Sequence, residues 1–207
     1  MKKLIPYLIL ITLSTQSFIL FPVKSEILKK ENYNSLKKYI ERKKIPIDLE
    51  KSLFLKKKSA FNELAFFKTA NANKKNINNF SIPDTYLFNK NSILIDENSL
   101  GGCIIDRPTF EKSDFYTEIL KENKIILSSK DSSIFNLEML KNNICDYQGN
   151  SIYPFEKDKA CLIFLWAKNK TSPNGLNYYI EYTIESLKKS TAEIDIYFLN
   201  ADEYSFL

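Results

Sequence analysis

Histidine is absent from this chain of 207 residues, and glycine and cysteine are scarce, with four and three residues respectively. Without histidine the chain has no imidazole general base, no Ser-His or Cys-His nucleophile pair and no imidazole metal ligand. None of the glycines falls in a P-loop or a G-x-G-x-x-G pattern, which excludes the common loops that cradle phosphate. The sequence therefore excludes many familiar catalytic and nucleotide-binding motifs.

The first 25 residues have the pattern of a secretory signal peptide. Lys2 and Lys3 precede an apolar run from Leu4 to Leu13, and Val23-Lys-Ser25 supplies the small residues that signal peptidase requires. An uncleaved membrane anchor is the alternative, but polar residues interrupt the run after about ten positions, too few to span a bilayer. We expect cleavage before Glu26 and an exported protein, periplasmic or extracellular, that meets the membrane only through its signal peptide before cleavage.

Charge gives no argument for a nucleic-acid partner. The net charge of +5 includes Lys2, Lys3 and Lys24, so removal of the signal leaves 27 basic against 25 acidic residues, or +2. Acidic residues near expected strand ends are ordinarily solvated, and no ligand spacing among them supports a metal site; these are Asp84, Asp96, Asp195, Asp202 and Glu203. We predict neither a metal nor another cofactor.

Residues 26–79 are rich in lysine, have a helical pattern and end in a polar linker. Apolar residues recur at helical spacing before and after Ile45-Pro46, which predicts two amphipathic helices joined there. The basic clusters Lys43-Lys44 and Lys56-Lys57-Lys58 favour solvated helix faces, with an anionic membrane surface or an acidic partner as the alternative. We predict a helical N-terminal segment over 26–79 and a separate domain over 80–207.

From residue 80 the pattern becomes that of a sheet protein. Thr85–Phe88 and Ser92–Ile95 are short β-rich runs separated by a turn-forming cluster, which predicts an antiparallel hairpin. Apolar spacing predicts a helix within 108–123. Asn143–Tyr147 and Ser151–Tyr153, with a glycine between them, predict a second hairpin.

The run Cys161–Trp166 is apolar on both faces and predicts a central strand covered by helices on each side. Ser172 is the expected N-cap of the next helix and Pro173 its first residue. A strand over Tyr178–Ile184 is the alternative, but length and the start signal favour a helix. Ile194–Leu199 then completes a strand-helix-strand crossover, which predicts a parallel, right-handed unit.

A turn at Asp146-Tyr-Gln-Gly-Asn, a strand that ends Trp166-Ala167 and a helix opened by Ser172-Pro173 follow one another. Together they resemble the first half of a thioredoxin-superfamily domain, in its exported thiol-disulfide oxidoreductase and peroxiredoxin-like branch. The resemblance implies that Thr171, Ser172, Pro173 and Asn174 occupy the position of the reactive Cys-x-x-Cys pair. Both cysteines are replaced, and a hydroxyl forms no mixed disulfide, so we expect no redox chemistry in this turn.

Phe80–Ile95, which begins Phe-Ser-Ile-Pro, is followed by Gly101-Gly102 and an expected helix. This segment resembles the second half of the same fold, where a cis proline faces the reactive turn and exposes a backbone edge to substrate. The resemblance implies that Pro83 belongs to a binding site. The halves stand in reversed order, so the expected fold is an α/β three-layer sandwich with a circularly permuted thioredoxin-like topology. Half a domain, split between genes or swapped between chains, is the alternative.

Three cysteines in an exported chain permit one disulfide and leave one thiol unpaired. Cys145 on the second hairpin and Cys161 in the central strand are the candidate pair, if their Cα atoms lie within about 7 Å. A buried inert thiol is the alternative for Cys161. Cys103 follows two glycines near Arg107, and it is the candidate for a reactive thiol.

Three hypotheses about function follow. The first is an exported, non-catalytic thioredoxin-like protein that binds a peptide or protein through Pro83 and residues 171–174. The second is an atypical thiol-disulfide oxidoreductase that uses Cys103, with Cys145 or Cys161 as the resolving thiol. The third is an envelope-interaction protein that binds through its N-terminal helical segment.

Overall fold

The computed structural model describes residues 30–56, 83–95, 114–125, 136–168 and 172–205, so the expected signal peptide lies outside the described residues. The elements, in chain order, are β1 (Lys30–Glu31), α2 (Tyr33–Lys43), the 3-10 helix η2 (Leu49–Lys51), β2 (Leu53–Leu55), β3 (Asp84–Phe88), α5 (Phe115–Glu122), the 3-10 helix η3 (Leu137–Leu140), β4 (Ile144–Cys145), β5 (Ala160–Trp166), α6 (Pro173–Lys189), β6 (Ile194–Asn200) and β7 (Glu203–Tyr204). None of the helices described here is long and apolar enough to cross a membrane.

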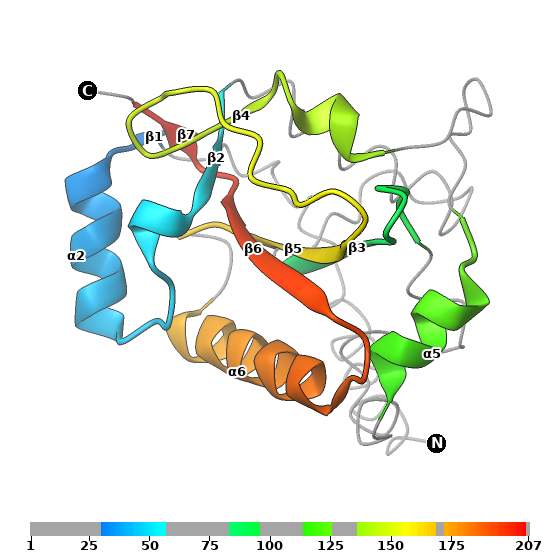
Figure 1. The fold of residues 1–207 in the computed structure, drawn as a ribbon. Helices are drawn as coiled ribbons and strands as arrows, with labels where there is room; N and C mark the ends of the chain where they lie inside the picture. The colour runs from blue at the N-terminus through cyan, green and yellow to red at the C-terminus, as the bar shows by residue number, and fades with distance from the viewer. Residues whose placement is uncertain (1–29, 57–82, 96–113, 126–135, 169–171, 206–207) are drawn as a thin grey trace, which may run out of the picture.

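Five strands form one mixed sheet in the order β3-β5-β6-β2-β4 (Figure 1). The three central strands are parallel, and the first and last strands in this order are antiparallel to their neighbours. β5 pairs with β6 along its whole length, from Ala160 opposite Ile194 to Trp166 opposite Asn200. Because α6 connects these two strands, the predicted parallel crossover is confirmed, and so is the mixed α/β class. A separate short pair joins β1 to β7 in parallel.

The start of α6 follows directly from its sequence. The Ser172 hydroxyl accepts a hydrogen bond from the Gly175 amide at 3.1 Å, and Pro173 is the first helical residue. A proline is tolerated there because the first amides of a helix have no intrahelical partner. Leu176 and Ile180 are fully buried on the face toward the sheet. The predicted helix, with its N-cap, is confirmed.

Alternate residues of β5 enter two different cores, because successive side chains of a strand point to opposite faces. Cys161, Ile163 and Leu165 pack with η3 and the irregular chain around Phe155. Leu162 packs with α5, while Phe164 and Trp166 pack with α2 and α6. Figure 1 shows α6 and α5 below the sheet and η3 above it. Burial on both faces is confirmed, but the described cover of one face is a 3-10 helix and loop.

Both predicted hairpins are present. After β3, the Asn89 amide donates to the Ile93 carbonyl at 3.0 Å and the Ile95 amide to the Leu87 carbonyl at 2.9 Å. The second hairpin is smaller, with a single bridge between Cys145 and Ser151. The Asp146 carboxylate closes its turn by accepting the amides of residues 148 and 150, each at 2.9 Å. α5 lies within the range predicted for a helix before residue 123.

The prediction of a second helix in the N-terminal segment is wrong for the residues that form β2. Leu53–Leu55 forms a strand between β6 and β4, with Leu53 opposite Leu199. A short apolar run fits a buried strand as well as a helix, so periodicity alone cannot separate them. Leu53 and Leu55 enter one core and Phe54 the other, so this segment belongs to the same sheet as the rest of the chain. The predicted boundary between residues 79 and 80 lies outside the described residues.

The position of Phe54 provides a test of this integration. The side chain is 0% exposed, and its ring centroid lies 4.5 Å from that of Tyr204. We expect Phe54→Ala to lower the free energy of unfolding by about 3 to 5 kcal/mol, because it leaves a cavity in the core. Urea denaturation measures this loss, and the exposed Lys38→Ala serves as the control from the same segment. A loss no larger than that of the control would contradict an integrated β2.

Candidate functional site at the carboxyl ends of the parallel strands

The structure brings part of the predicted site to one end of the sheet. Asp84 pairs with Leu165, so Pro83, which is half-buried, comes next to the end of β5. Ser172 and Asn174 lie exposed at the start of α6, a few residues after β5 ends. Thr171 and Cys103 lie outside the described residues. Pro83 and the start of α6 therefore share the carboxyl end of β5.

The predicted disulfide between Cys145 and Cys161 is not formed, because both thiols are free and buried. They lie in β4 and β5, which β6 and β2 separate. Neighbouring strands are about 4.8 Å apart, so three spacings exceed the roughly 7 Å that a disulfide allows. Burial raises the pKa of the Cys145 thiol to about 11 and that of Cys161 to about 12. The alternative for Cys161, a buried inert thiol, is the one that fits the structure.

A lysine beyond the end of β5 connects the sheet to the N-terminal elements. The Lys168 ammonium lies 2.8 Å from Glu31 Oε2 and donates to Ser35 Oγ at 2.7 Å. The Ser35 hydroxyl in turn donates to Glu31 Oε2 at 2.6 Å. Glu31 belongs to β1 and is 7% exposed, while Ser35 lies in the first turn of α2. The three side chains form one closed triangle of charge-assisted contacts.

A buried carboxylate lies beside this triangle. Asp202 follows β6 and is 2% exposed, and its Oδ2 accepts the Lys168 amide at 2.8 Å. The same oxygen accepts from Asn200 Nδ2 at 3.1 Å, and Asn200 Oδ1 accepts the Asp202 amide at 3.1 Å. Lys168 thus interacts with one carboxylate through its side chain and with the other through its backbone. The expectation that acids at these strand ends are solvated is wrong for Asp202.

The electrostatics of this group are unusual for a protein interior. Burial raises the pKa of Asp202, and the negative charge of Glu31 acts in the same direction. The hydrogen bonds from Lys168 and Asn200 and the charge of Lys168 only partly oppose it. Two nearly buried carboxyl groups therefore lie near one ammonium, and their proximity favours the protonated form of Asp202. Such perturbed groups concentrate at functional sites, although structural networks also produce them.

Three buried polar atoms in this region have no hydrogen-bond partner within the described residues. They are Asp202 Oδ1, the Tyr39 hydroxyl and the Trp166 indole nitrogen. The negative charge of Asp202 contributes to a raised pKa of Tyr39, after the larger effect of burial. The Lys168 ammonium lies 5.9 Å from the centre of the Tyr39 ring. Buried polar groups are nearly always paired in native proteins, so these three atoms are an exception within the described chain.

Sequence reasoning missed Glu31, Ser35 and Lys168, and it misassigned Asp202. A usable signal existed for two of them, because Lys168 and Asp202 each follow one of two adjacent parallel strands. The carboxyl ends of such strands are where α/β proteins place their ligands. Glu31 had no comparable signal, because it lies 137 residues from Lys168 in the sequence.

The described residues contain no group of three His, Cys, Asp or Glu side chains that could hold a metal ion. Comparisons with protein-family models, with curated proteins and with solved structures found no match to this chain.

The buried thiols provide a direct test. In a Cys103→Ser variant we expect neither Cys145 nor Cys161 to react with a disulfide reagent at pH 8 while the protein is folded. Burial limits access, and the raised pKa values leave little thiolate at that pH. Colorimetric thiol counting should give about two thiols only after guanidinium is added. Rapid labelling of either cysteine in the native protein would contradict this placement.

Asp202 gives a prediction about pH. Its folded-state pKa is raised, so the folded state binds the proton more tightly, and this favourable contribution is lost as pH rises through the folded pKa. Asp202→Asn keeps an acceptor for the Lys168 amide but cannot ionise. We therefore expect the unfolding free energy of the variant, minus that of the unchanged protein, to increase as the pH rises above 3.8, the ordinary pKa of an aspartic acid. Denaturation at several pH values measures it, with the exposed Glu122→Gln as control. A difference independent of pH would contradict the prediction.

Proposed function

We propose that this is an exported protein whose thioredoxin-like domain, with its halves in reversed order, binds a peptide or protein partner. The turn at residues 171–174 performs no thiol chemistry in this proposal. The site would consist of Pro83 and the start of α6, next to the buried group around Lys168 and Asp202.

The topology supports the reversed order of the halves. The hairpin that begins with β3 packs antiparallel against β5, and α5 follows that hairpin in the chain. α5 and α6 lie on the same face, where Leu87, Ile119 and Leu162 share one core. A strand, helix and strand unit, with a hairpin and helix beside its first strand, is the arrangement that the resemblance implies. This order of elements also requires Pro83 to precede the first strand of the hairpin, as it does.

The observation that carries the proposal is the register between β3 and β5. Asp84 opposite Leu165 brings Pro83 to the end of β5 that leads into α6. At the start of that helix, Ser172 supplies a hydroxyl cap where the family has a reactive thiol. A hydroxyl is a good cap but cannot exchange disulfides, so in this proposal the position keeps a helix cap and has no redox group.

The oxidoreductase hypothesis loses part of its support. It requires a resolving thiol, and Cys145 and Cys161 are buried with raised pKa values. Neither is suited to attack a mixed disulfide without a local opening of the core.

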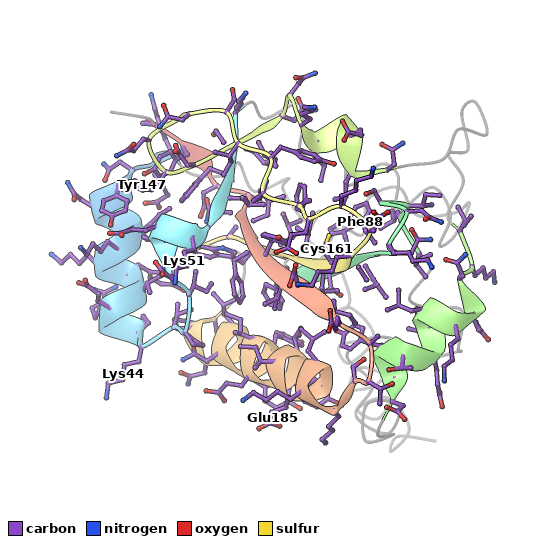
Figure 2. The ribbon with its side chains drawn as sticks, in the orientation of Figure 1. Lys44, Lys51, Phe88, Tyr147, Cys161 and Glu185 are labelled. Carbon is purple, nitrogen blue, oxygen red and sulfur yellow. The ribbon has the colours of Figure 1, made fainter. Side chains whose placement is uncertain are left out.

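The envelope-interaction hypothesis has one specific observation in its favour. The outward face of α2 and the residue that follows it expose five basic side chains against one acid; the bases are Lys37, Lys38, Arg42, Lys43 and Lys44. Figure 2 shows Lys44 pointing away from the body of the molecule. A surface of this kind suits anionic lipid or an acidic partner. Removal of the whole segment would not test it, because β2 belongs to the central sheet.

Binding of an extended peptide tests the proposal. The probe is labelled, carboxymethylated insulin B chain, and fluorescence anisotropy measures its affinity. We expect Pro83→Ala to weaken binding about tenfold, because the variant removes the rigid backbone edge beside the turn. Pro46→Ala changes an exposed proline elsewhere and should bind as the unchanged protein does. Equal affinity for both variants, or no binding by the unchanged protein, would overturn the proposed site.

The same protein should fail to accelerate the reduction of intact insulin by dithiothreitol. Turbidity measures this reaction, and Cys103→Ser is the matched variant. An acceleration that disappears in Cys103→Ser would show thiol catalysis and would overturn the non-catalytic part of the proposal, whatever the peptide-binding result.

A further inference from the structure

A depression of about 510 Å³ lies at the opposite end of the sheet, where β5 and β6 begin. Four segments surround it: the hairpin turn after β3, the end of α5, the turn before β5 and the turn before β6. Phe88 pairs with Cys161 at this end, and Figure 2 labels both residues. The depression shares no residue with the site around Pro83 and Lys168.

A buried asparagine ties the hairpin turn to α5. Asn89 is 5% exposed, and its side-chain amide donates to Asn123 Oδ1 at 2.7 Å. The side-chain oxygen of Asn89, Oδ1, accepts hydrogen bonds from the backbone amides of Asn91 and Ile93, each at 3.0 Å. These bonds hold the left-handed residue Asn123, which ends α5, against the turn. Two walls of the depression are thereby fixed relative to each other.

The other walls are joined in the same way. Thr117 of α5 is 6% exposed, and its hydroxyl oxygen accepts the amides of Thr191 and Ala192 at 3.0 and 3.3 Å. Lys159, before β5, forms an ion pair with Asp195 of β6 at 2.9 Å. Each wall is held by hydrogen bonds or an ion pair that do not depend on a ligand. A preorganised site of this kind loses little entropy when it binds.

Besides Lys159, which is paired with Asp195, four charged side chains line the depression, two cations and two carboxylates, one from each segment. Lys90, Lys121, Asp158 and Glu193 line the depression and are exposed. Within the described residues none of the four side chains forms an ion pair or a hydrogen bond. The cations and the carboxylates thus face one cavity without neutralising each other. Leu120 and two alanines, Ala160 and Ala192, provide a small apolar floor between them.

We propose that this depression binds a short zwitterionic peptide. The peptide carboxylate pairs with Lys90 and Lys121, and its ammonium pairs with Asp158 and Glu193. The volume falls in the range of small-ligand pockets, roughly 300 to 1,000 Å³. About three extended residues span roughly 10 Å, which allows the two termini to reach opposite sides of such a cavity. The side-chain amide of Asn91 is available on the wall to hydrogen-bond the peptide backbone.

Titration with trialanine tests the inference, with backbone amide shifts of Asn91, Asn123 and Ala192 as the readout. We expect saturable shifts at a Kd on the order of 1 mM or lower. N-acetylated and C-amidated trialanine each lack one charge and should bind about tenfold more weakly. Equal binding of the blocked peptides, or no shifts up to roughly 50 mM trialanine, would overturn the proposal, since millimolar affinity is the weakest that counts as a site.

Paired variants assign each end of the peptide. We expect the double variant Lys90→Gln, Lys121→Gln to lose the preference for a peptide with a free carboxylate. We expect the double variant Asp158→Asn, Glu193→Gln to lose the preference for a peptide with a free ammonium. Lys38→Gln with Lys43→Gln, two exposed positions on α2 that do not line the depression, removes the same charge from elsewhere and should change neither preference. Exposed substitutions of this kind usually alter stability by less than about 0.5 kcal/mol, so the fold is retained. Preferences unchanged in both pocket variants would overturn the assignment.

Discussion

The burial of β5 on both faces is the constraint on which the rest of this structure depends. All seven residues of the strand are buried, and its neighbours β3 and β6 pair with it along its length. Burial on two faces requires two separate layers of cover, which α6, α2 and α5 supply on one side and η3 with its adjoining loop on the other. Side chains from this strand enter each of the three clusters of buried apolar residues in the described chain.

At the end of a strand buried this deeply, the backbone amides and carbonyls need hydrogen-bond partners within the protein. Where β5 leaves the sheet, its backbone must find partners away from water, and Asp202 accepts the Lys168 amide for that reason. The lysine then brings its charge into the same region, where Glu31 pairs with it. The result links β1, α2, β5 and the segment after β6 through one buried network. Removing one partner of such a network leaves an uncompensated charge, which is why its members act as a unit.

The two ends of the sheet differ in how their polar groups are used. At the carboxyl end, Glu31 pairs with Lys168, and the buried Asp202 accepts hydrogen bonds from the chain. At the amino end, the buried polar residues Asn89 and Thr117 hold the walls. Among the residues that the structure describes, the exposed side chains of Lys90, Lys121, Asp158 and Glu193 have no ionic partner. The first arrangement suits a site that positions backbone, and the second suits recognition of a charged small molecule.

The sequence by itself determined several local elements between residues 80 and 207. Ser172-Pro173 specified the start of α6, the Asn89 cluster specified a hairpin turn, and the apolar run before Trp166 specified a buried strand. These predictions depend on hydrogen bonds and periodicities within a few residues, so they can be read directly. The resemblance to thioredoxin-like domains, which rests on the order of such segments, is compatible with the mixed sheet and remains a proposal.

Only the tertiary structure decided the rest. Leu53–Leu55 became a strand because β6, far along the chain, offers it a partner, and three apolar residues give no period from which to infer that. The strand order separated Cys145 from Cys161, and their spacing in sequence contains no information about that order. Lys168 and Glu31 meet for the same reason. Long-range pairing fixes which side chains become neighbours, whereas the sequence fixes which local shapes are available to be paired.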